Sequence, residues 1–423
     1  MKKIYALLLV MVLVFSLAGC GEKKDGEETN KDTKKETVKL TFMENFQAYE
    51  PVTEALEEVV GDFMKEHPEI EIDYIPGTSD YEVILKTKMA TNDLPDLWTT
   101  HGWSVARYSE YMMTLDDQSW VKDLHPAIKP VITDKDGHIY VLPMDVDISG
   151  IAYNKDVVEA AGVDVTKIIN WEDMFDAMEK IKKSGVTPVH IGGKDQWTVG
   201  NFFDWVAPSM FITDEDNYLG DELKAGEFDI ERWKIAAGLM TQLRDNEYLN
   251  VDALTSAFSD SARALAEGTA AFEFFGNYVI SEALTYNPEA NLGFFPVPAY
   301  YEGDEPSLIS GERTAVGIWK DSKHPEEAKL FLDYLAKPEV VAKIATANSI
   351  PAGLTTATSD TGNLADSYEL WKNVEAFPFF DREYLPSGMW DTMCSTGSGI
   401  IAGGMTKEEA ANKMLEDFNK LYK

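Results

Sequence analysis

The sequence predicts an α/β protein with two compact units, and three observations support this. Segments that alternate apolar and polar residues are separated by amphipathic helical segments, which indicates strands alternating with helices. The pattern occurs twice, once before and once after about Ile148. A chain of 423 residues, 44% of them apolar, is also long enough to form more than one core.

The first unit begins with a strand in which Val38, Leu40 and Phe42 lie on one face. The helix that follows has apolar residues at helical spacing and ends before Pro68. The expected elements are strands at 38–43, 70–74 and 97–98, and helices at 54–67 and 81–91.

The second unit repeats this alternation over a longer stretch of chain. We expect strands at 150–154, 187–192 and 270–275. The expected helices of this stretch lie at 155–162, 171–185, 228–246 and 261–268, and further helices are expected later in the chain at 326–336, 340–347 and 407–423. No repeat of fixed period is visible, so the units are not a solenoid.

The charge and cysteine content exclude several classes of protein. The net charge is −35, and such a surface repels nucleic acid and anionic lipid headgroups. The chain has two cysteines, Cys20 and Cys394. If Cys20 is modified, Cys394 has no partner within the chain, so a disulfide framework is excluded.

The N-terminus has the pattern of an export signal. Lys2 and Lys3 precede an apolar stretch that is too short to cross a bilayer comfortably. It ends in Leu-Ala-Gly-Cys, which resembles the lipobox of bacterial lipoproteins; the alternative is an ordinary secretory signal that contains a cysteine. The resemblance implies that residues 1–19 are removed, and that acyl chains such as palmitate anchor Cys20 to the cell membrane.

Residues 20–37 comprise the lipidated cysteine and a segment rich in Lys, Glu, Asp, Thr and Asn. After Cys20 this segment has no aliphatic or aromatic residue to bury, so we expect a flexible tether. The rest of the chain is then held at the extracellular face of the membrane.

Motifs for cofactors and metals are weak in this sequence. The Gly-Ser-Gly-Ile-Ile-Ala segment from Gly397 matches the dinucleotide fingerprint only superficially, since no strand precedes it. The Asp134–Gly137 segment lacks the later ligands of a calcium loop and is expected to be a hairpin turn. The six histidines include no pair at zinc-ligand spacing. The sequence therefore predicts neither a cofactor nor a metal.

Short motifs along most of the chain resemble the extracellular solute-binding proteins of bacterial ABC importers, in the group that binds sugars and oligosaccharides. Each fragment is weak alone, but their order and spacing together are specific. They are Asn92–Asp96, Gly137–Pro143, Ala152–Asp156, Asn170–Asp173, Glu267–Ala271, Phe295–Pro298, His324–Ala328 and Ile350–Ala352. Departures from the family are Asn92, where glycine is usual, and Phe272–Phe274, where a Met-containing strand is common.

The resemblance implies a two-lobed fold of the type II periplasmic-binding-protein class, with a ligand cleft between lobes joined by hinge segments. We place the first lobe at residues 38–144 plus 296–350 and the second at 145–295 plus 351–423. The implied partners are an oligosaccharide and the transmembrane subunits of an ABC permease. We expect a monomer that contacts the membrane only through its lipid anchor and does not bind nucleic acid.

A sugar site combines aromatic rings, which pack on C–H faces, with polar groups that bind hydroxyls. Trp103 and Asn45 each follow a predicted strand, at the edge where α/β sheets bind ligands. Asp145 and Asp147 lie at the predicted lobe crossing and point the same way if the segment is extended. Arg313 follows the second lobe crossing. It could bind hydroxyl groups through two hydrogen bonds at once, or form a surface ion pair.

The remaining candidates come from the second lobe. Trp197 lies in a predicted loop and could stack on a sugar, whereas Trp205 is expected to be mainly core. Tyr278 stands where the family resemblance implies an aromatic residue that stacks on sugar. Trp390 precedes a glycine-rich segment, at a place where the resemblance implies an aromatic residue near the cleft.

The sequence is compatible with three functions. The resemblance favours a receptor that captures an oligosaccharide by closing its lobes and delivers it to a permease, without being an enzyme. An extracellular glycoside hydrolase is the alternative, with Asp147 and either Asp145 or Glu312 as its carboxylate pair. A binding lipoprotein that feeds a sensor is a third possibility.

Overall fold

The computed structural model describes residues 37–47, 50–78 and 80–422. The predicted signal peptide and the predicted lipidation site Cys20 lie outside these residues, as does all of the predicted tether except Thr37. Within the described part of the chain, no helix combines the length and apolar character needed to cross a bilayer.

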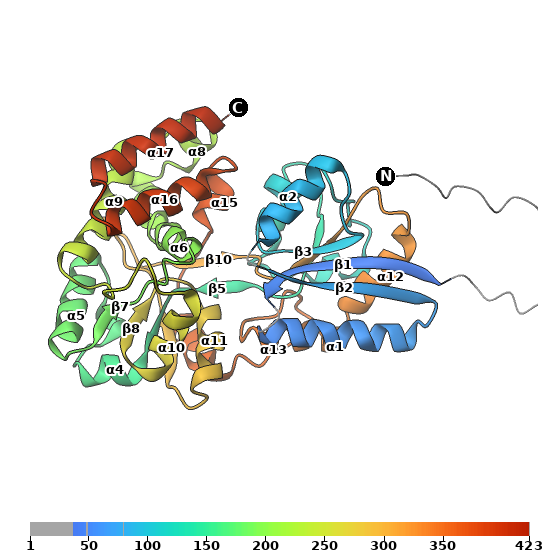
Figure 1. The fold of residues 1–423 in the computed structure, drawn as a ribbon, viewed down its shortest axis with the longest axis horizontal. Helices are drawn as coiled ribbons and strands as arrows, with labels where there is room; N and C mark the ends of the chain where they lie inside the picture. The colour runs from blue at the N-terminus through green and yellow to red at the C-terminus, as the bar shows by residue number, and fades with distance from the viewer. Residues whose placement is uncertain (1–36, 48–49, 79, 423) are drawn as a thin grey trace, which may run out of the picture. The chain divides into compact units, whose positions relative to one another are not determined.

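The first lobe is built on a five-stranded sheet with the strand order β2-β1-β3-β11-β4 (Figure 1). β1 runs parallel to β2 and β3, whereas β11 runs antiparallel to β3 and β4. The strands are β1 (Val38–Gln47), β2 (Ile70–Gly77), β3 (Leu97–Thr100), β4 (Val141–Pro143) and β11 (Ala315–Ile318). As the alternation predicts, Leu40 and Phe42 are fully buried.

Among the described residues, the α-helices of the first lobe are α1 (Pro51–Glu66), α2 (Tyr81–Thr91), α3 (Lys129–Ile132), α12 (Pro325–Leu335) and α13 (Pro338–Ala347). The apolar stripe of α1 buries Leu56, Val59 and Phe63, which confirms the predicted helical face. Proline can occupy the first turn of a helix without losing a hydrogen bond, and Pro51 does so in α1.

The second lobe is built on a four-stranded sheet with the order β7-β8-β6-β9. A third, three-stranded sheet has the order β12-β10-β5. The strands of these two sheets are β5 (Asp147–Ser149), β6 (Ile151–Asn154), β7 (Thr187–Val189), β8 (Ala270–Glu273), β9 (Leu292–Phe295), β10 (Leu308–Gly311) and β12 (Ala376–Pro378).

Most of the helices lie in the second lobe, where α17 packs against α9 and α16 (Figure 1). They are α4 (Lys155–Ala160), α5 (Trp171–Lys183), α6 (Trp197–Val206), α7 (Pro208–Phe211), α8 (Gly220–Lys224), α9 (Ile230–Asp245), α10 (Phe258–Glu267), α11 (Tyr278–Tyr286), α14 (Ala365–Trp371), α15 (Phe380–Tyr384), α16 (Met389–Ile401) and α17 (Lys407–Leu421).

Separate apolar cores stabilise the two lobes. One core joins buried residues of β1, β3, β4 and β11 with those of α1, α12 and α13. Two further cores join the strands and helices of the second lobe. Val297 and Ile309 pack in the second lobe, whereas Ala352 and Leu354 pack in the first. The α/β class and the two-lobed architecture are thus as predicted.

The segment of Trp197, which was predicted to be a loop, is helical, and so is the glycine-rich segment after Trp390, for which no element was predicted. Trp197 is the first residue of α6 rather than part of a loop. The glycine-rich segment after Trp390 forms most of α16. A Cβ atom at Gly397 would lie 2.5 Å from Val199 and 2.6 Å from Phe203, so glycine allows α16 to approach α6 closely.

Candidate ligand-binding cleft

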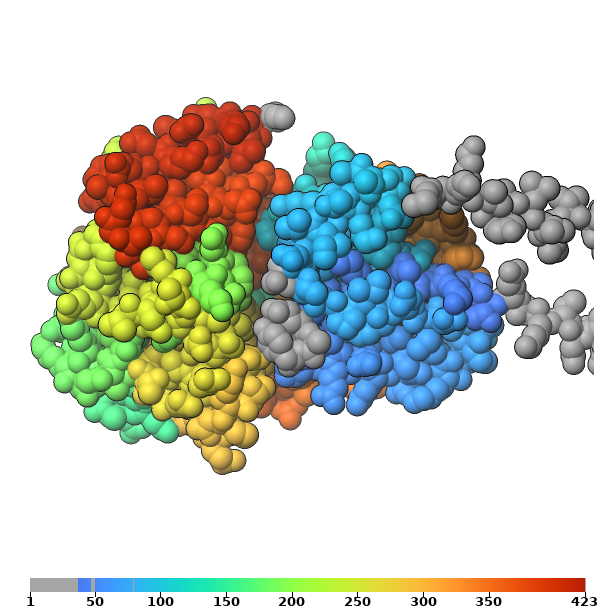
Figure 2. Space-filling model, in the orientation of Figure 1, coloured from blue at the N-terminus to red at the C-terminus, as the bar shows by residue number. Residues whose placement is uncertain are grey.

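A cavity of about 910 Å³ is lined by residues of both lobes. Ligand pockets in proteins typically span about 300–1,000 Å³, so this one lies at the large end of that range. Figure 2 shows the blue surface of the first lobe bordering the green, yellow and red surface of the second lobe. Among the predicted site residues, those that line the cavity are Asn45, Trp103, Asp147, Trp197, Tyr278, Arg313 and Trp390.

Trp103 enters the cavity from the segment that follows β3. Its backbone is left-handed, with φ 63°, after Gly102 with φ 114°. Strained backbone of this kind gathers at functional sites. The guanidinium of Arg107 lies 4.1 Å from the centre of the Trp103 ring, and that of Arg382, from the second lobe, lies 4.6 Å away. Trp103 therefore contacts a cation from each lobe.

Asn45 lies near the end of β1, beside the end of β3. Its backbone N–H donates to Thr99 Oγ1 at 2.8 Å, and its side-chain Oδ1 accepts a hydrogen bond from the same hydroxyl. Because β1 and β3 are parallel neighbours, their carboxyl ends meet at one edge of the sheet. This topology brings Asn45 and Trp103 to the same cavity.

Aromatic side chains of the second lobe form the opposite side of the cavity. The Trp197 ring lies 4.9 Å from Phe258 and 6.3 Å from Tyr278, measured between ring centres. The Tyr278 hydroxyl accepts a hydrogen bond from Asn201 Nδ2 at 2.7 Å, which fixes the ring. Trp390 packs over α6, where a Cβ atom at Gly200 would lie 3.1 Å from its ring.

Arg313 connects the two sides of the cavity. Its guanidinium lies 4.9 Å from the ring centre of Phe46 in the first lobe and 4.4 Å from that of Tyr278 in the second. Its Nη2 also lies 3.5 Å from Glu50 Oε2. Cation–π contacts of this kind contribute about 0.5–2 kcal/mol each. Arg313 therefore takes part in packing across the cavity as well as in an ion pair.

Asp145 does not line the cavity, unlike Asp147 two residues later. Asp145 Oδ1 accepts a hydrogen bond from Thr314 N at 2.7 Å, and Oδ2 accepts one from Asn348 Nδ2 at 2.7 Å. The segment changes its pairing partner between the two acids. Asp145 pairs with Ala352, whereas Asp147 begins β5 and pairs with Gly311.

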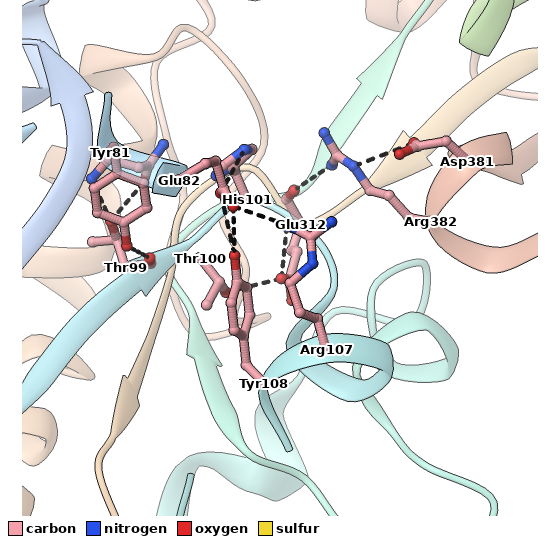
Figure 3. Close-up of polar contacts among 12 residues, drawn as sticks. Tyr81, Glu82, Thr99, Thr100, His101, Arg107, Tyr108, Glu312, Asp381 and Arg382 are labelled. Atoms are coloured by element: carbon pink, nitrogen blue, oxygen red, sulfur yellow. Dashed lines mark hydrogen bonds and ion pairs between the residues drawn. The ribbon is translucent and has the colours of Figure 1, made fainter. Parts of the chain in front are cut away.

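A network of charged groups surrounds the first-lobe side of the cavity (Figure 3). Arg107 donates to Glu82 at 2.9 Å, and the Tyr108 hydroxyl lies 3.2 Å from the same carboxylate. Burial, together with the nearby Arg382 and Arg107, lowers the pKa of His101 well below its usual value. His101 is therefore neutral at pH 7 and can take part in hydrogen bonds without adding charge.

Several cavity residues were not predicted from the sequence. Trp205 was expected to be mainly core; it is 1% exposed and donates to Gly150 O at 3.0 Å, yet it also lines the cavity. The unpredicted charged residues are Glu50, Asp80, Glu82, Lys86, Arg107, Lys194, Asp195, Arg382 and Asp391. Arg382 gives no signal in the sequence, because the short helix α15 that carries it shows no periodic pattern.

Potential metal ligands do not cluster in the described ranges. Within them, no group of three or more His, Cys, Asp and Glu side chains is arranged to hold a metal ion. The chemistry that the cavity offers is thus stacking on aromatic rings and hydrogen bonding to polar and charged side chains. This combination suits a ligand with both C–H faces and hydroxyl groups.

The chain belongs to a family of extracellular binding proteins. Residues 49–342 match the family described as bacterial extracellular solute-binding protein. A cleft between two α/β lobes, lined by aromatic and polar residues from both, is consistent with that description.

Individual relatives match over nearly the whole chain. The melibiose/raffinose/stachyose-binding protein MelE of Bacillus subtilis is 31% identical over 425 residues, which is 100% of this chain and 97% of that protein. A sugar transporter of Bacillus licheniformis, solved in complex with stachyose, has a TM-score of 0.83 and 35% identity, covering 91% of this chain and 100% of its own. A Bacillus subtilis binding protein solved in an open conformation has a TM-score of 0.81 and 30% identity, covering 91% and 98%.

Proposed function

We propose that this chain is the substrate-binding lipoprotein of an ABC importer and that it captures an oligosaccharide outside the cell. The observation that carries the proposal is the cleft, in which aromatic rings and hydrogen-bonding groups from both lobes face one cavity. The relatives named for melibiose, raffinose and stachyose support a ligand of two or more rings.

Binding would work by closure of the two lobes. A ligand that contacts both lobes at once stabilises the closed form by its differential affinity for that form. Trp103 and Asn45 would supply contacts from the first lobe, and Trp197, Tyr278 and Trp390 from the second. Asp147 and Arg313, near the crossing segments, would bind hydroxyl groups. The closed form would then deliver the sugar to a membrane permease.

We also keep as proposals the features that lie outside the described residues. Cys20 would carry the lipid anchor, and the segment up to residue 37 would tether the lobes to the extracellular face of the membrane. We propose that the chain acts as a monomer. The lobe boundary at residue 144 remains a proposal as well. For the boundaries predicted at residues 295 and 350, the packing of Val297 and Ile309 in the second core and of Ala352 and Leu354 in the first supports crossings some residues later.

Catalysis is not part of this proposal. A glycoside hydrolase needs two carboxyl groups on either side of one bond. The pair Asp145 and Asp147 cannot serve, because Asp145 lies outside the cavity with both oxygens hydrogen-bonded. The pair Asp147 and Glu312 does line the cleft, but the relatives are binding proteins, so we expect bound sugar to be released intact.

A thermal-shift screen tests the proposal. The protein is the mature chain from residue 20, with Cys20→Ser to prevent lipidation, and the ligands are mono- and oligosaccharides including melibiose, raffinose and stachyose. A ligand at 100 times its Kd should add about 2.7 kcal/mol of stability. We expect a shift with an oligosaccharide that chromatography then recovers intact. Shortened sugar would indicate a hydrolase, and no shift with any sugar would contradict carbohydrate binding.

A further inference from the structure

Glu312 is a buried acid that lines the cleft and is 1% exposed. It follows β10 on the segment that leads into the first-lobe strand β11. One carboxylate oxygen, Oε1, accepts hydrogen bonds from Thr100 Oγ1 at 2.8 Å and Gly102 N at 2.7 Å. Two donors of the first lobe thus fix the orientation of this carboxylate.

The other oxygen of this carboxylate, Oε2, is buried and has no hydrogen-bond partner among the described residues. The same is true of Oδ1 of Asp147, which also lines the cleft and is 2% exposed. The hydroxyls of Ser104 and Ser149 lie near Glu312 and Asp147 and lower their pKa, but neither hydroxyl completes a hydrogen bond to these two oxygens. A buried charged acceptor without a donor is costly, so a bound molecule with a hydrogen-bond donor would stabilise each oxygen. Burial raises the pKa of both carboxyl groups above the ordinary value.

The arginines that line the cleft already face acids of the protein. Arg107 lies 2.9 Å from Glu82, Arg313 lies 3.5 Å from Glu50, and Arg382 lies 3.8 Å from Asp381. Figure 3 shows Arg382 between Glu312 and Asp381. The guanidinium charges of Arg107 and Arg313 are therefore partly balanced before any ligand binds, whereas burial and the neighbouring Asp204 raise the pKa of Asp381 beside Arg382.

The Nε atoms of Arg107, Arg313 and Arg382 are buried without a hydrogen-bond partner in the part of the chain that the structure describes. The cleft thus offers unpaired donors as well as the unpaired acceptors of Glu312 and Asp147. A hydroxyl group satisfies both kinds, because it donates one hydrogen bond and accepts others. A carboxylate or phosphate cannot donate to the two acids, and its charge would repel theirs in a poorly solvated site.

We propose that Glu312 and Asp147 form a charge filter, which admits neutral polyhydroxylated ligands and rejects sugars with a carboxylate or phosphate next to these two acids. The inference rests on the carbohydrate binding proposed above and adds the chemical class of the sugar. Within the filter, Glu312 is a specificity-determining residue whose free oxygen receives a hydrogen bond from a ligand hydroxyl.

The test compares neutral with anionic forms of the same sugar. The probes are raffinose and its singly oxidised forms, in which one primary hydroxyl at a time is converted to a carboxylate. Dissociation constants are measured by calorimetry at pH 7.5 on the Cys20→Ser mature chain. The wild-type cleft should bind raffinose, and the form with its carboxylate beside the filter should bind at least about 100-fold more weakly.

Glu312→Gln is the informative variant. The glutamine carbonyl can keep the hydrogen bonds from Thr100 and Gly102, while its NH₂ group replaces the free acceptor by a donor. We expect raffinose to bind about 10-fold more weakly and the discrimination against the carboxylated form to fall by at least about 10-fold. Asp391→Asn is the matched control, since Asp391 lines the same cleft but is exposed, and solvent screens its charge.

The outcomes separate this inference from the proposed function. An unchanged ratio of neutral to anionic binding in Glu312→Gln, or wild-type protein that binds every carboxylated form as tightly as raffinose, overturns the charge filter while carbohydrate binding stands. If Glu312→Gln fails to fold, the ratio of the dissociation constants for neutral and carboxylated raffinose is measured in Asp147→Asn instead. A ratio equal to that of the wild type would also overturn the charge filter. Failure of the wild type to bind any neutral sugar of the thermal-shift panel would overturn carbohydrate binding, and the filter with it.

Discussion

Asp145 and Asp147 are two acids of the same segment for which the structure predicts opposite mutant phenotypes. Asp145 lies outside the cleft and accepts hydrogen bonds from Thr314 and Asn348. Asp147 lines the cleft with one oxygen unpaired. Asp145→Asn should therefore change stability and leave binding intact, whereas Asp147→Asn should weaken binding by about 10-fold or more with little loss of stability.

The size of the stability effect follows from the pKa. Burial raises the pKa of Asp145 from 3.8 to about 6, despite the hydrogen bonds that lower it. The folded state thus holds its proton at pH values where the unfolded chain has released it. The free energy of unfolding then falls as pH rises from about 4 to about 6 and is constant above that. One pKa unit corresponds to about 1.4 kcal/mol, so the buried Asp145 carboxylate lowers the free energy of unfolding by about 3 kcal/mol at pH 7.

The assay is urea denaturation of wild type and Asp145→Asn at pH 4 and pH 7. Other acidic groups titrate in both proteins, so their effects on the free energy of unfolding cancel when the wild type is subtracted from the variant. The stability of Asp145→Asn relative to wild type should rise by about 2–3 kcal/mol between the two pH values. The reasoning is wrong if that difference stays constant with pH, or if Asp145→Asn weakens sugar binding as much as Asp147→Asn does.

Three further predictions concern packing and reactivity. Arg382→Met removes the cation–π contact with Trp103 across the cleft, which is worth about 0.5–2 kcal/mol. The radius of gyration of the ligand-free protein, measured by X-ray scattering, should therefore rise. An unchanged radius would contradict a role of Arg382 in closure of the lobes. Gly276→Ala would place a Cβ atom 2.8 Å from Trp205, whereas Gly303→Ala has a similar positive φ and no neighbour within 4 Å. The melting temperature should therefore fall further for Gly276→Ala, and equal losses would exclude the steric clash as the cause. Burial raises the pKa of Cys394 to about 12, so a thiol reagent at pH 8 should label the Cys20→Ser chain only as it unfolds; fast labelling of the native protein would contradict this.

The elements that the sequence predicted well have strong local patterns. The helix at 81–91 was predicted with the bounds that the structure has, and the strand beginning at Val38 was predicted from its alternation. Helix α16 was not predicted, because a glycine-rich sequence gives little helix signal. The glycines of α16 allow close packing against α6, and packing against a distant segment cannot be recognised from the local sequence.

The candidate site could be predicted where topology determines it. Asn45 and Trp103 follow neighbouring parallel strands, so strand order alone brings them together. Asp145 could not be separated from Asp147 in this way, because the segment changes its pairing partner between them. Arg382 could not be found at all, since only tertiary folding brings its short helix against Trp103.

The central claim is that one sugar molecule binds between the two lobes and contacts both. A crystal structure of the mature Cys20→Ser chain with the oligosaccharide that gives the largest thermal shift tests this directly. The account predicts intact sugar in the cleft, with a ring stacked on an aromatic residue of the second lobe and hydroxyls within hydrogen-bond distance of Asp147 and Glu312. Sugar bound to one lobe alone, bound elsewhere on the surface, or cleaved in the cleft would contradict it.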